Sequence, residues 1–448
     1  MKKYKKLFII IILSFLFLCF FKGLKSYISF YHFDCCKVKS HISYLSSNKL
    51  KGRLPGTVGN QLAAQYIKSE FEKTGLKPLE KTYFQKFNIK YPCKIEGETP
   101  YLNVLDKDNK IIKSFTYGKE FKEDMLNFKN NSILFNKENS NFSSKGISVT
   151  SGNDRFILYK SKDDLNFRSS FMINAPSSMY IMITNNTLNQ IKNYVEKGYS
   201  IKCYIPYNIK SSSVVNVLSK IEGKSKNLYP IVISAHFDHV GTDLNNNVYN
   251  GALDNASGTS FLLELSKYIK SLGTPKRDII FAAFNGEEFG FLGATAFANK
   301  YYNELKNSKV FNFDMIGGKK SCALCLMGAK KDSKSNEFVR SISSACSSEK
   351  INFNELFEDS SDHTPFRARN IDAVTFCDYD LSKIHTPKDK VQFIENDSIN
   401  RCFKIASKEI VKCSFGFNPF INHYKLIMCI SGLGIVIILI YCSKSNKK

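Results

Sequence analysis

The chain has 448 residues, 43% of them hydrophobic, which excludes bulk disorder and allows one large domain with an inserted or satellite unit. Its 64 basic and 40 acidic residues leave a net charge of +24, which suits an anionic membrane or cell surface. The lysines are scattered and form no block interleaved with aromatic residues, so nucleic acid is not an expected partner.

The first 25 residues resemble a membrane-targeting segment. A lysine-rich start precedes residues 7–21, an apolar run broken only by Ser14. This pattern describes a signal peptide or an uncleaved signal anchor. The anchor is favoured because no small-x-small cleavage site follows the apolar run.

The next segment, residues 38–85, holds a turn-rich stretch and then a helix. Residues 52–56 read GRLPG, and five apolar residues at helical spacing follow them. Gly75 is the expected end of this helix. From 86 to 213 the pattern changes: short β-rich pieces at 132–135 and 155–159 alternate with Asn-, Ser- and Lys-rich loops, which predicts an inserted β-rich or mixed subdomain.

Residues 214–420 alternate between strand and helix patterns. Strands are expected at 231–235, 278–284, 310–313 and 372–377, and a helix is expected to begin near Asn255 and end at Gly273. This order predicts an α/β fold with a mixed, largely parallel central sheet flanked by helices.

A second apolar segment, residues 426–442, predicts a C-terminal transmembrane helix of near-minimal length. Lysines at both extreme ends of the chain would place both termini in the cytoplasm. We therefore expect a cell-membrane protein whose intervening domain is extracytoplasmic. Thirteen cysteines include one isolated CxxC, at Cys322 and Cys325, which is no zinc-finger pattern and leaves disulfide pairing open.

Metal-ligand residue types follow each of the four predicted strands. His236 and Asp238 follow the first strand, Glu287 and Glu288 the second, Asp314 the third and His385 the fourth. Asp254 lies just before the expected helix. Each alone has an ordinary structural explanation, such as a core histidine, a solvated carboxylate pair or a helix cap. Together they would meet at one edge of one sheet, because functional groups gather beyond the carboxyl ends of parallel strands. Two imidazoles and three carboxylates suit Zn²⁺ or another divalent metal.

Six ordered motifs carry a resemblance to a known family. They lie at residues 232–241, 251–258, 284–290, 312–317, 361–366 and 384–389, with further likeness at 52–56 and 216–223. In these segments the chain resembles the two-zinc, co-catalytic aminopeptidase family that also includes glutamate carboxypeptidase and glutaminyl cyclase. The resemblance covers about residues 38–85 and 214–415.

The resemblance implies two zinc ions and a role for each residue. Asp254 would bridge the ions; Glu288 and His385 would complete one site, and His236 with Asp314 the other. Asp238 would hold the ring of His236, and Glu287 would be the general base. The implied enzyme is a membrane-anchored metallo-aminopeptidase that hydrolyses N-terminal residues from peptides through a metal-bridging hydroxide.

Other functions remain open at this stage. The same metal centre serves carboxypeptidases and dipeptidases, and the fold also serves glutaminyl cyclases. A catalytically inactive surface receptor would be expected to have lost a ligand or the base, and none is missing. Ile384 stands where many relatives have a polar or aromatic residue; His239 and His363 are interpreted as structural, and Asp359, Ser360 and Asp362 as pocket residues without assigned roles.

Overall fold

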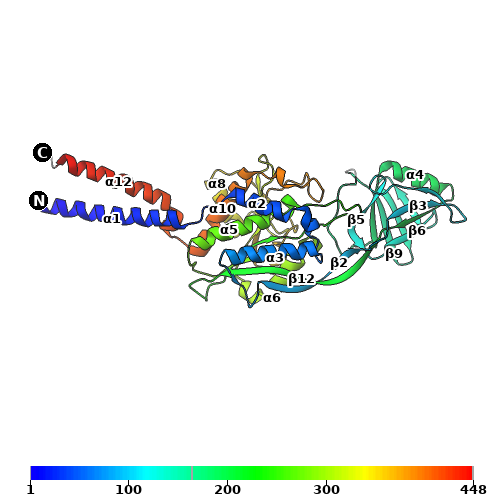
Figure 1. The fold of residues 1–448 in the computed structure, drawn as a ribbon, viewed down its shortest axis with the longest axis horizontal. Coiled ribbons are helices and arrows are strands. Elements are labelled where there is room, and N and C mark those ends of the chain that lie inside the picture. Colours follow the sequence, from blue (N-terminus) through cyan, green and yellow to red (C-terminus); the bar gives the residue numbers. More distant parts are fainter. Residues whose placement is uncertain (1, 163–164, 446–448) are drawn as a thin grey trace.

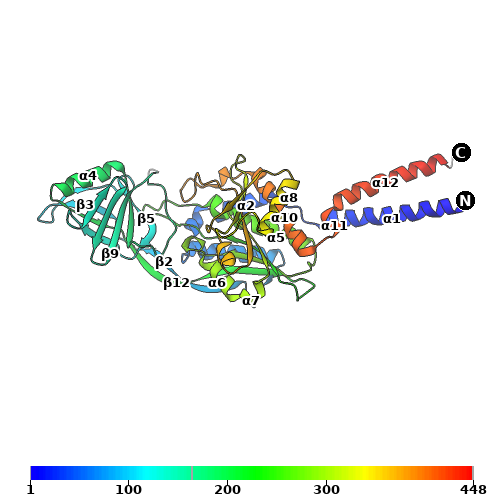
Figure 2. The ribbon, with the colours of Figure 1, turned by 180° about the vertical axis from the view of Figure 1, so that it is seen from behind.

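A computed structural model describes residues 2–162 and 165–445. The molecule is elongated: two long helices project from one end, a helix-flanked sheet occupies the middle, and a group of smaller sheets forms the other end (Figures 1 and 2). This arrangement confirms the expected α/β fold with apolar helices at both ends of the chain.

The central sheet has nine strands in the order β1-β12-β14-β13-β15-β18-β16-β17, with β2 paired to β12. The strands are β1 (Lys77–Pro78), β2 (Phe84–Lys94), β12 (Tyr207–Ile221), β13 (Ile231–His236), β14 (Ile279–Phe284), β15 (Lys309–Phe313), β16 (Leu324–Gly328), β17 (Phe353–Phe357) and β18 (Asp372–Cys377). β14, β13, β15 and β18 are parallel neighbours, whereas β12 and β16 pair antiparallel with the strands beside them. The parallel strands are buried on both faces, which explains their continuous apolar runs.

Helices cover this sheet. They are α2 (Cys35–Leu45), α3 (Val58–Lys73), α5 (Gly258–Ser271), α6 (Leu292–Lys300), α7 (Tyr302–Leu305), α8 (Glu337–Ser348), α9 (Thr364–Ala368) and α10 (Asn396–Phe415), with the short turns η1 (Asn48–Arg53), η2 (Ala252–Ser257), η3 (Glu287–Phe289) and η4 (Val391–Phe393). The short helix α11 (Pro419–Asn422) instead contacts the helices at the two ends of the chain. The helix expected to begin near Asn255 begins at Gly258 instead. Asn255 is not helical, because its side-chain oxygen accepts hydrogen bonds from the N–H groups of Gly258 and Met315.

The far end of the molecule is built from two further sheets. One has the order β5-β10-β9-β8-β7 and the other β4-β3-β11-β6. Their elements are β3 (Tyr101–Leu105), β4 (Ile111–Ser114), β5 (Phe121–Phe128), β6 (Ser132–Phe135), β7 (Ser140–Ser143), β8 (Gly146–Ser151), β9 (Asp154–Lys160), β10 (Met179–Ile183), β11 (Ser200–Tyr204) and α4 (Asn185–Glu196). We call this unit the insert. The paired strands β2 and β12 form the ribbon that joins it to the central sheet, and the predicted boundaries at 86 and 213 fall within that ribbon.

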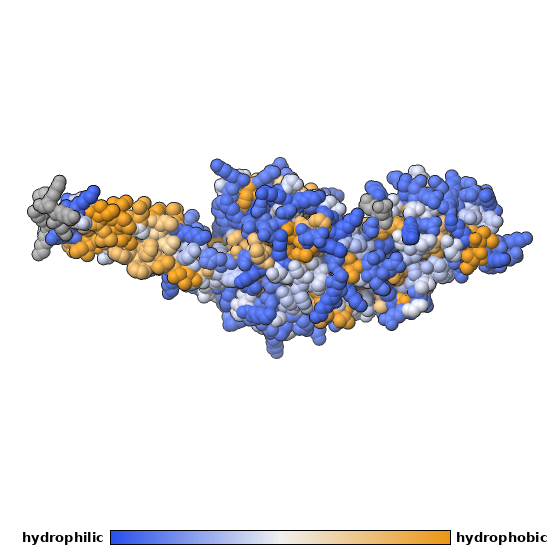
Figure 3. All heavy atoms as spheres, turned by 45° about the horizontal axis from the view of Figure 1, so that its top comes forward, coloured by the Kyte–Doolittle hydropathy of each residue, from blue (hydrophilic) through white to orange (hydrophobic). Residues whose placement is uncertain are grey.

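The terminal helices α1 (Lys2–Ser29) and α12 (Tyr424–Ser445) lie side by side, with both chain ends at the same tip (Figures 1 and 2). Both are long and apolar enough to cross a membrane. Their outward-facing surface is the largest continuous apolar area in Figure 3. Lys447 and Lys448, on which the expected orientation partly depends, lie outside the described residues.

Candidate active site

The parallel strands deliver the predicted side chains to one edge of the sheet. His236 is the last residue of β13, Asp314 directly follows β15, and Glu287 and Glu288 come three and four residues after β14. His385 follows β18 by a longer loop. Because β13, β14, β15 and β18 run in the same direction, their carboxyl ends meet at that edge.

A first group of metal-ligand types consists of His236, Asp254 and Asp314, all buried. Nε2 of His236 lies 3.3 Å from Oδ1 of Asp314 and 3.6 Å from Oδ1 of Asp254. These contacts leave room for a cation among three donor atoms, because the atoms all lie within 4.8 Å of one another.

A second group consists of Asp254, Glu288, His385 and His239, again all buried. Nε2 of His385 lies 3.1 Å from both Oδ2 of Asp254 and Oε1 of Glu288. Asp254 is therefore common to both groups, with one carboxylate oxygen turned toward each. The peptide bond between Asp254 and Asn255 is cis.

His239 belongs to the second group although the sequence favoured a structural interpretation. Its Nδ1 atom lies 3.0 Å from Oε1 of Glu288 and 3.7 Å from Oδ2 of Asp254. The signal available in the sequence was the short spacing between His236, the last residue of β13, and His239 in the loop that follows. The other histidine interpreted as structural, His363, has both ring nitrogens engaged, by Thr375 Oγ1 and the Glu358 carbonyl, each at 2.8 Å.

Asp238 and Glu287 flank these groups. The carboxylate of Asp238 accepts hydrogen bonds from the backbone N–H groups of Glu287 and Glu288, both at 3.2 Å, and lies 3.7 Å from Nδ1 of His236. Asp238 thus fixes the turn that presents the two glutamates. Burial raises the pKa of Glu287 well above its usual range; the positive charge of His236 opposes this, and the carboxylate of Glu288 adds to it.

Arg53 supports the site, and the sequence did not predict this role. The sequence marked Arg53 only as part of the GRLPG stretch at residues 52–56. Its fully buried guanidinium donates to the carbonyls of Leu45, Phe237, Asn250 and Gly251 at 2.6–2.9 Å. It therefore ties the segment after β13, next to His236 and His239, to the segment before η2, which carries Asp254. Burial lowers the pKa of Arg53 to about 10, against the opposing effect of Asp254 and other nearby carboxylates.

The electrostatics of the two groups suit a cation. Burial alone would lower the pKa of His385, but the carboxylates of Glu288 and Asp254 raise it well above its usual range. Burial likewise would raise the pKa of Glu288, but His385 and His239 hold it well below its usual range. Glu288 thus favours its ionised form beside a His385 that favours its protonated form, and a divalent ion would take the place of that proton. The donor set of imidazoles and carboxylates fits zinc.

A cavity of about 200 Å³ opens onto both groups. Its polar lining includes Ser170, Asp254, Glu287, Glu288, Asp314, Glu358, Ser360 and His385. Its apolar side is formed by Met315, Met327, Leu381 and Ile384, with Cys377 and Tyr379 beside them. Of the three pocket residues named from the sequence, Ser360 lines the cavity, whereas Asp362 is fully buried and Asp359 accepts a hydrogen bond from the N–H of Lys330.

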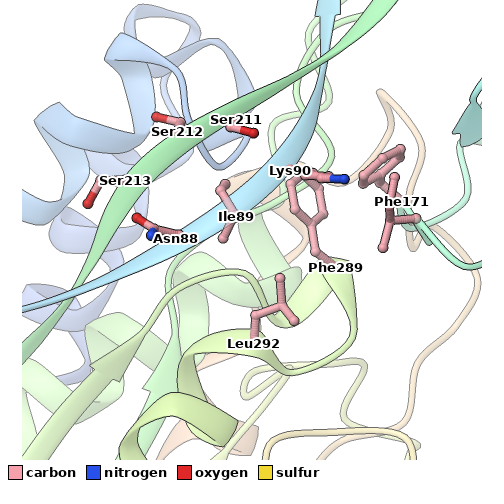
Figure 4. A pocket seen from close by; sticks show the side chains of 10 residues that line it. Asn88, Ile89, Lys90, Phe171, Ser211, Ser212, Ser213, Phe289 and Leu292 are labelled. Carbon is pink, nitrogen blue, oxygen red and sulfur yellow. The ribbon is translucent and has the colours of Figure 1, made fainter.

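A larger groove of about 650 Å³ lies beside the β2–β12 ribbon. Figure 4 shows its lining: Asn88, Ile89 and Lys90 come from β2, Ser211, Ser212 and Ser213 from β12, Phe289 from η3 and Leu292 from α6. Phe171 and Ile173 complete the lining. No carboxylate, imidazole or thiol lines the groove. The smaller cavity is therefore the candidate active site.

Comparison with known proteins agrees with this geometry. Residues 216–410 match Peptidase family M28. Aminopeptidase YwaD of Bacillus subtilis is 29% identical over 397 residues, which cover 83% of each chain. A vacuolar membrane protease of Kluyveromyces lactis is 41% identical over 109 residues, which cover 24% of this chain and 11% of the protease. Among solved structures, the zinc aminopeptidase BSAP of Bacillus subtilis matches with a TM-score of 0.61 at 20% identity, over 87% of this chain and 97% of that one. An aminopeptidase from Aneurinibacillus sp. strain AM-1 matches with a TM-score of 0.59 at 17% identity, over 86% and 94%. Residues 216–410 thus match peptidase family M28, and the chain is a hydrolase of the metallo-aminopeptidase type.

Proposed function

We propose that the chain is a membrane-anchored zinc exopeptidase that removes N-terminal residues from peptides. The observation that carries this proposal is the shared carboxylate of Asp254, which turns one oxygen to each of two donor groups at the cavity that also holds Glu287. Two Zn²⁺ ions would fit: one held by His236, Asp254 and Asp314, and one by Asp254, Glu288 and His385. When bound, such a pair polarises the scissile carbonyl and makes water more acidic.

Glu287 would act as the general base. It lies at the cavity but belongs to neither donor group, and two bound cations nearby would favour its ionised form, so its carboxylate would accept a proton from water and pass it to the leaving amine. Asp238 would be a positioning residue, because it fixes the backbone of Glu287 and Glu288 and faces the ring of His236.

The size of the cavity supports exopeptidase action. A space of about 200 Å³ fits one side chain and the adjoining peptide group rather than an extended segment of polypeptide. Met315, Met327, Leu381 and Ile384 would receive that side chain.

The peptidase domain would comprise residues 38–85 and 214–420, with residues 86–213 as its inserted subdomain. α1 and α12 would anchor it in the cell membrane with the catalytic domain extracytoplasmic, since both helices satisfy the length and apolarity of a membrane span. Labelling of introduced surface cysteines by a membrane-impermeant reagent in intact cells tests this orientation: catalytic-domain positions should react, and positions near residue 444 should not.

The catalytic proposal is tested with purified full-length protein and a panel of free-amino and N-blocked peptide substrates. We expect cleavage of free-amino substrates only, abolished by a chelator and restored by Zn²⁺. Cleavage of N-blocked substrates alone would favour carboxypeptidase action, and a folded protein that binds no divalent ion would contradict the proposal.

A further inference from the structure

One loop of the insert reaches the candidate metal centre. We call residues 167–171 the insert loop. The N–H of Arg168 donates to the carbonyl of His385 at 3.1 Å, and the carbonyl of Arg168 lies 2.9 Å from Nδ1 of His385. A carbonyl only accepts hydrogen bonds, so Nδ1 carries the hydrogen and Nε2 is the nitrogen turned toward Asp254 and Glu288. The ring of Phe167 stacks on the ring of His385 with centroids 5.8 Å apart.

The same loop holds the second residue of that donor group. The hydroxyl of Ser170 donates to Oε2 of Glu288 at 2.6 Å. Oε1 of Glu288 faces His385 and His239 at 3.1 and 3.0 Å. The two carboxylate oxygens are therefore divided: Oε1 lies among the metal-ligand types, and Oε2 is held by the serine.

In the other donor group a serine also holds one carboxylate oxygen, and this serine belongs to the catalytic domain. The hydroxyl of Ser361 donates to Oδ2 of Asp314 at 2.7 Å, while Oδ1 of Asp314 faces His236 at 3.3 Å. Each group thus has one carboxylate whose outer oxygen is fixed by a serine. The two serines come from different parts of the chain: Ser361 belongs to the catalytic domain, and Ser170 belongs to the insert.

The insert loop is anchored firmly enough to orient these ligands. The guanidinium of Arg168 forms an ion pair of 2.8 Å with Glu123 of β5, and both side chains are fully buried. The N–H and hydroxyl of Ser169 both donate to Asp124 at 2.8 Å. Phe171 packs edge-on against Phe289, with 5.1 Å between the ring centroids, and both rings line the groove shown in Figure 4.

We propose that Ser170 is a positioning residue for one of the two metal sites, so that the insert completes the metal centre. This inference rests on the proposed function, because it takes Glu288 and His385 as metal ligands. Hydrogen bonds to ligating carboxylates and imidazoles fix their orientation, and their loss typically costs about 10–100-fold in metal affinity.

The test is calorimetric titration of chelator-treated, full-length protein with Zn²⁺, and with Co²⁺ for its visible absorption, which reports ligand geometry. Wild type should bind two ions. Ser170→Ala should weaken one site about 10–100-fold and shift the Co²⁺ spectrum of that site. Ser361→Ala should weaken the other site, and Ser170→Ala with Ser361→Ala should weaken both.

Two further variants separate positioning from general damage to the loop. Ser169→Ala removes only the hydroxyl bond to Asp124; the backbone N–H of residue 169 and the ion pair of Arg168 with Glu123 still anchor the loop, so both affinities should remain within about twofold. Ser170→Thr keeps the hydroxyl and should restore most of the affinity. Unchanged metal affinity and an unchanged Co²⁺ spectrum in Ser170→Ala would overturn the inference while leaving the proposed function intact. A wild-type protein that binds no divalent ion would instead overturn the proposed function.

Discussion

Glu287 and Glu288 are consecutive in the chain, yet their carboxyl groups have opposite protonation tendencies. Burial favours the neutral form of both, but His385 and His239 hold the pKa of Glu288 well below its usual range, whereas that of Glu287 is raised well above it. The short turn η3 lets the two side chains diverge: Glu288 faces the histidines, and Glu287 stays outside both donor groups.

This divergence predicts different effects of the same substitution at the two positions. Glu287→Gln should lower kcat about 10²–10⁴-fold with metal content unchanged, because it removes a proton acceptor and no ligand. Glu288→Gln, the matched control, should lose metal as well as activity. Activity assays and metal analysis on both purified variants check this, and a fully active Glu287→Gln protein would refute the assignment of the base.

The shared carboxylate of Asp254 predicts the metal stoichiometry of single variants. Asp314→Ala should bind one ion fewer than wild type, because Asp314 belongs to the first group only. Asp254→Ala should retain neither ion tightly, because it removes a ligand from both groups. Metal analysis after dialysis at fixed free Zn²⁺ measures both, and equal losses in the two variants would contradict a bridging Asp254.

Arg53 should matter for stability as much as for activity. Arg53→Leu leaves four buried carbonyls without their donor, so we expect the free energy of unfolding to fall by about 3 kcal/mol or more. Arg340→Leu, at an exposed position of α8, should change it by less than about 0.5 kcal/mol. Denaturant unfolding of the two variants gives the comparison, and similar midpoints would argue against a structural role for the buried guanidinium.

His41 predicts a pH dependence of stability away from the active site. Nε2 of His41 faces Nζ of Lys267 at 3.3 Å and Nδ1 faces the hydroxyl of Tyr66 at 2.6 Å, which suits a neutral ring. Burial, assisted by the charge of Lys267, lowers the pKa of His41 to about 4 from its ordinary 6.5. Between these values the unfolded chain binds a proton that the folded protein does not, so stability is lost as pH falls from 6.5 toward 4.

The size of this effect is at most about 3 kcal/mol. Replacement by glutamine removes the titrating group, so the difference in Tm between wild type and His41→Gln should narrow as pH is lowered from 7 to 4.5. Thermal unfolding across this range measures the difference. A constant gap would show that His41 does not titrate in this way.

The terminal helices should be dispensable for the fold. In the apolar windows of α1 and α12 only 6% and 11% of residues are buried, so removing them takes little from the core. A truncated chain of residues 31–418 should be recovered without detergent, with kcat/KM within about threefold of the full-length protein. Recovery of the full-length chain in the soluble fraction of lysed cells would count against membrane anchoring.

The sequence alone predicted the fold class and both apolar helices, because periodicity and continuous hydrophobic runs reflect burial directly. It also identified the residues that the parallel strands bring to one edge, since β13, β14, β15 and β18 each lead into a metal-ligand type. Only the tertiary structure showed that His239 belongs to the second group, because the sequence pattern of a loop does not indicate where its side chains point. The same holds for Arg53, whose partners are backbone carbonyls and have no residue signature. Ser170 lies 118 positions from Glu288, within a β-rich insert that carries no catalytic motif, and only the folded chain brings the two together.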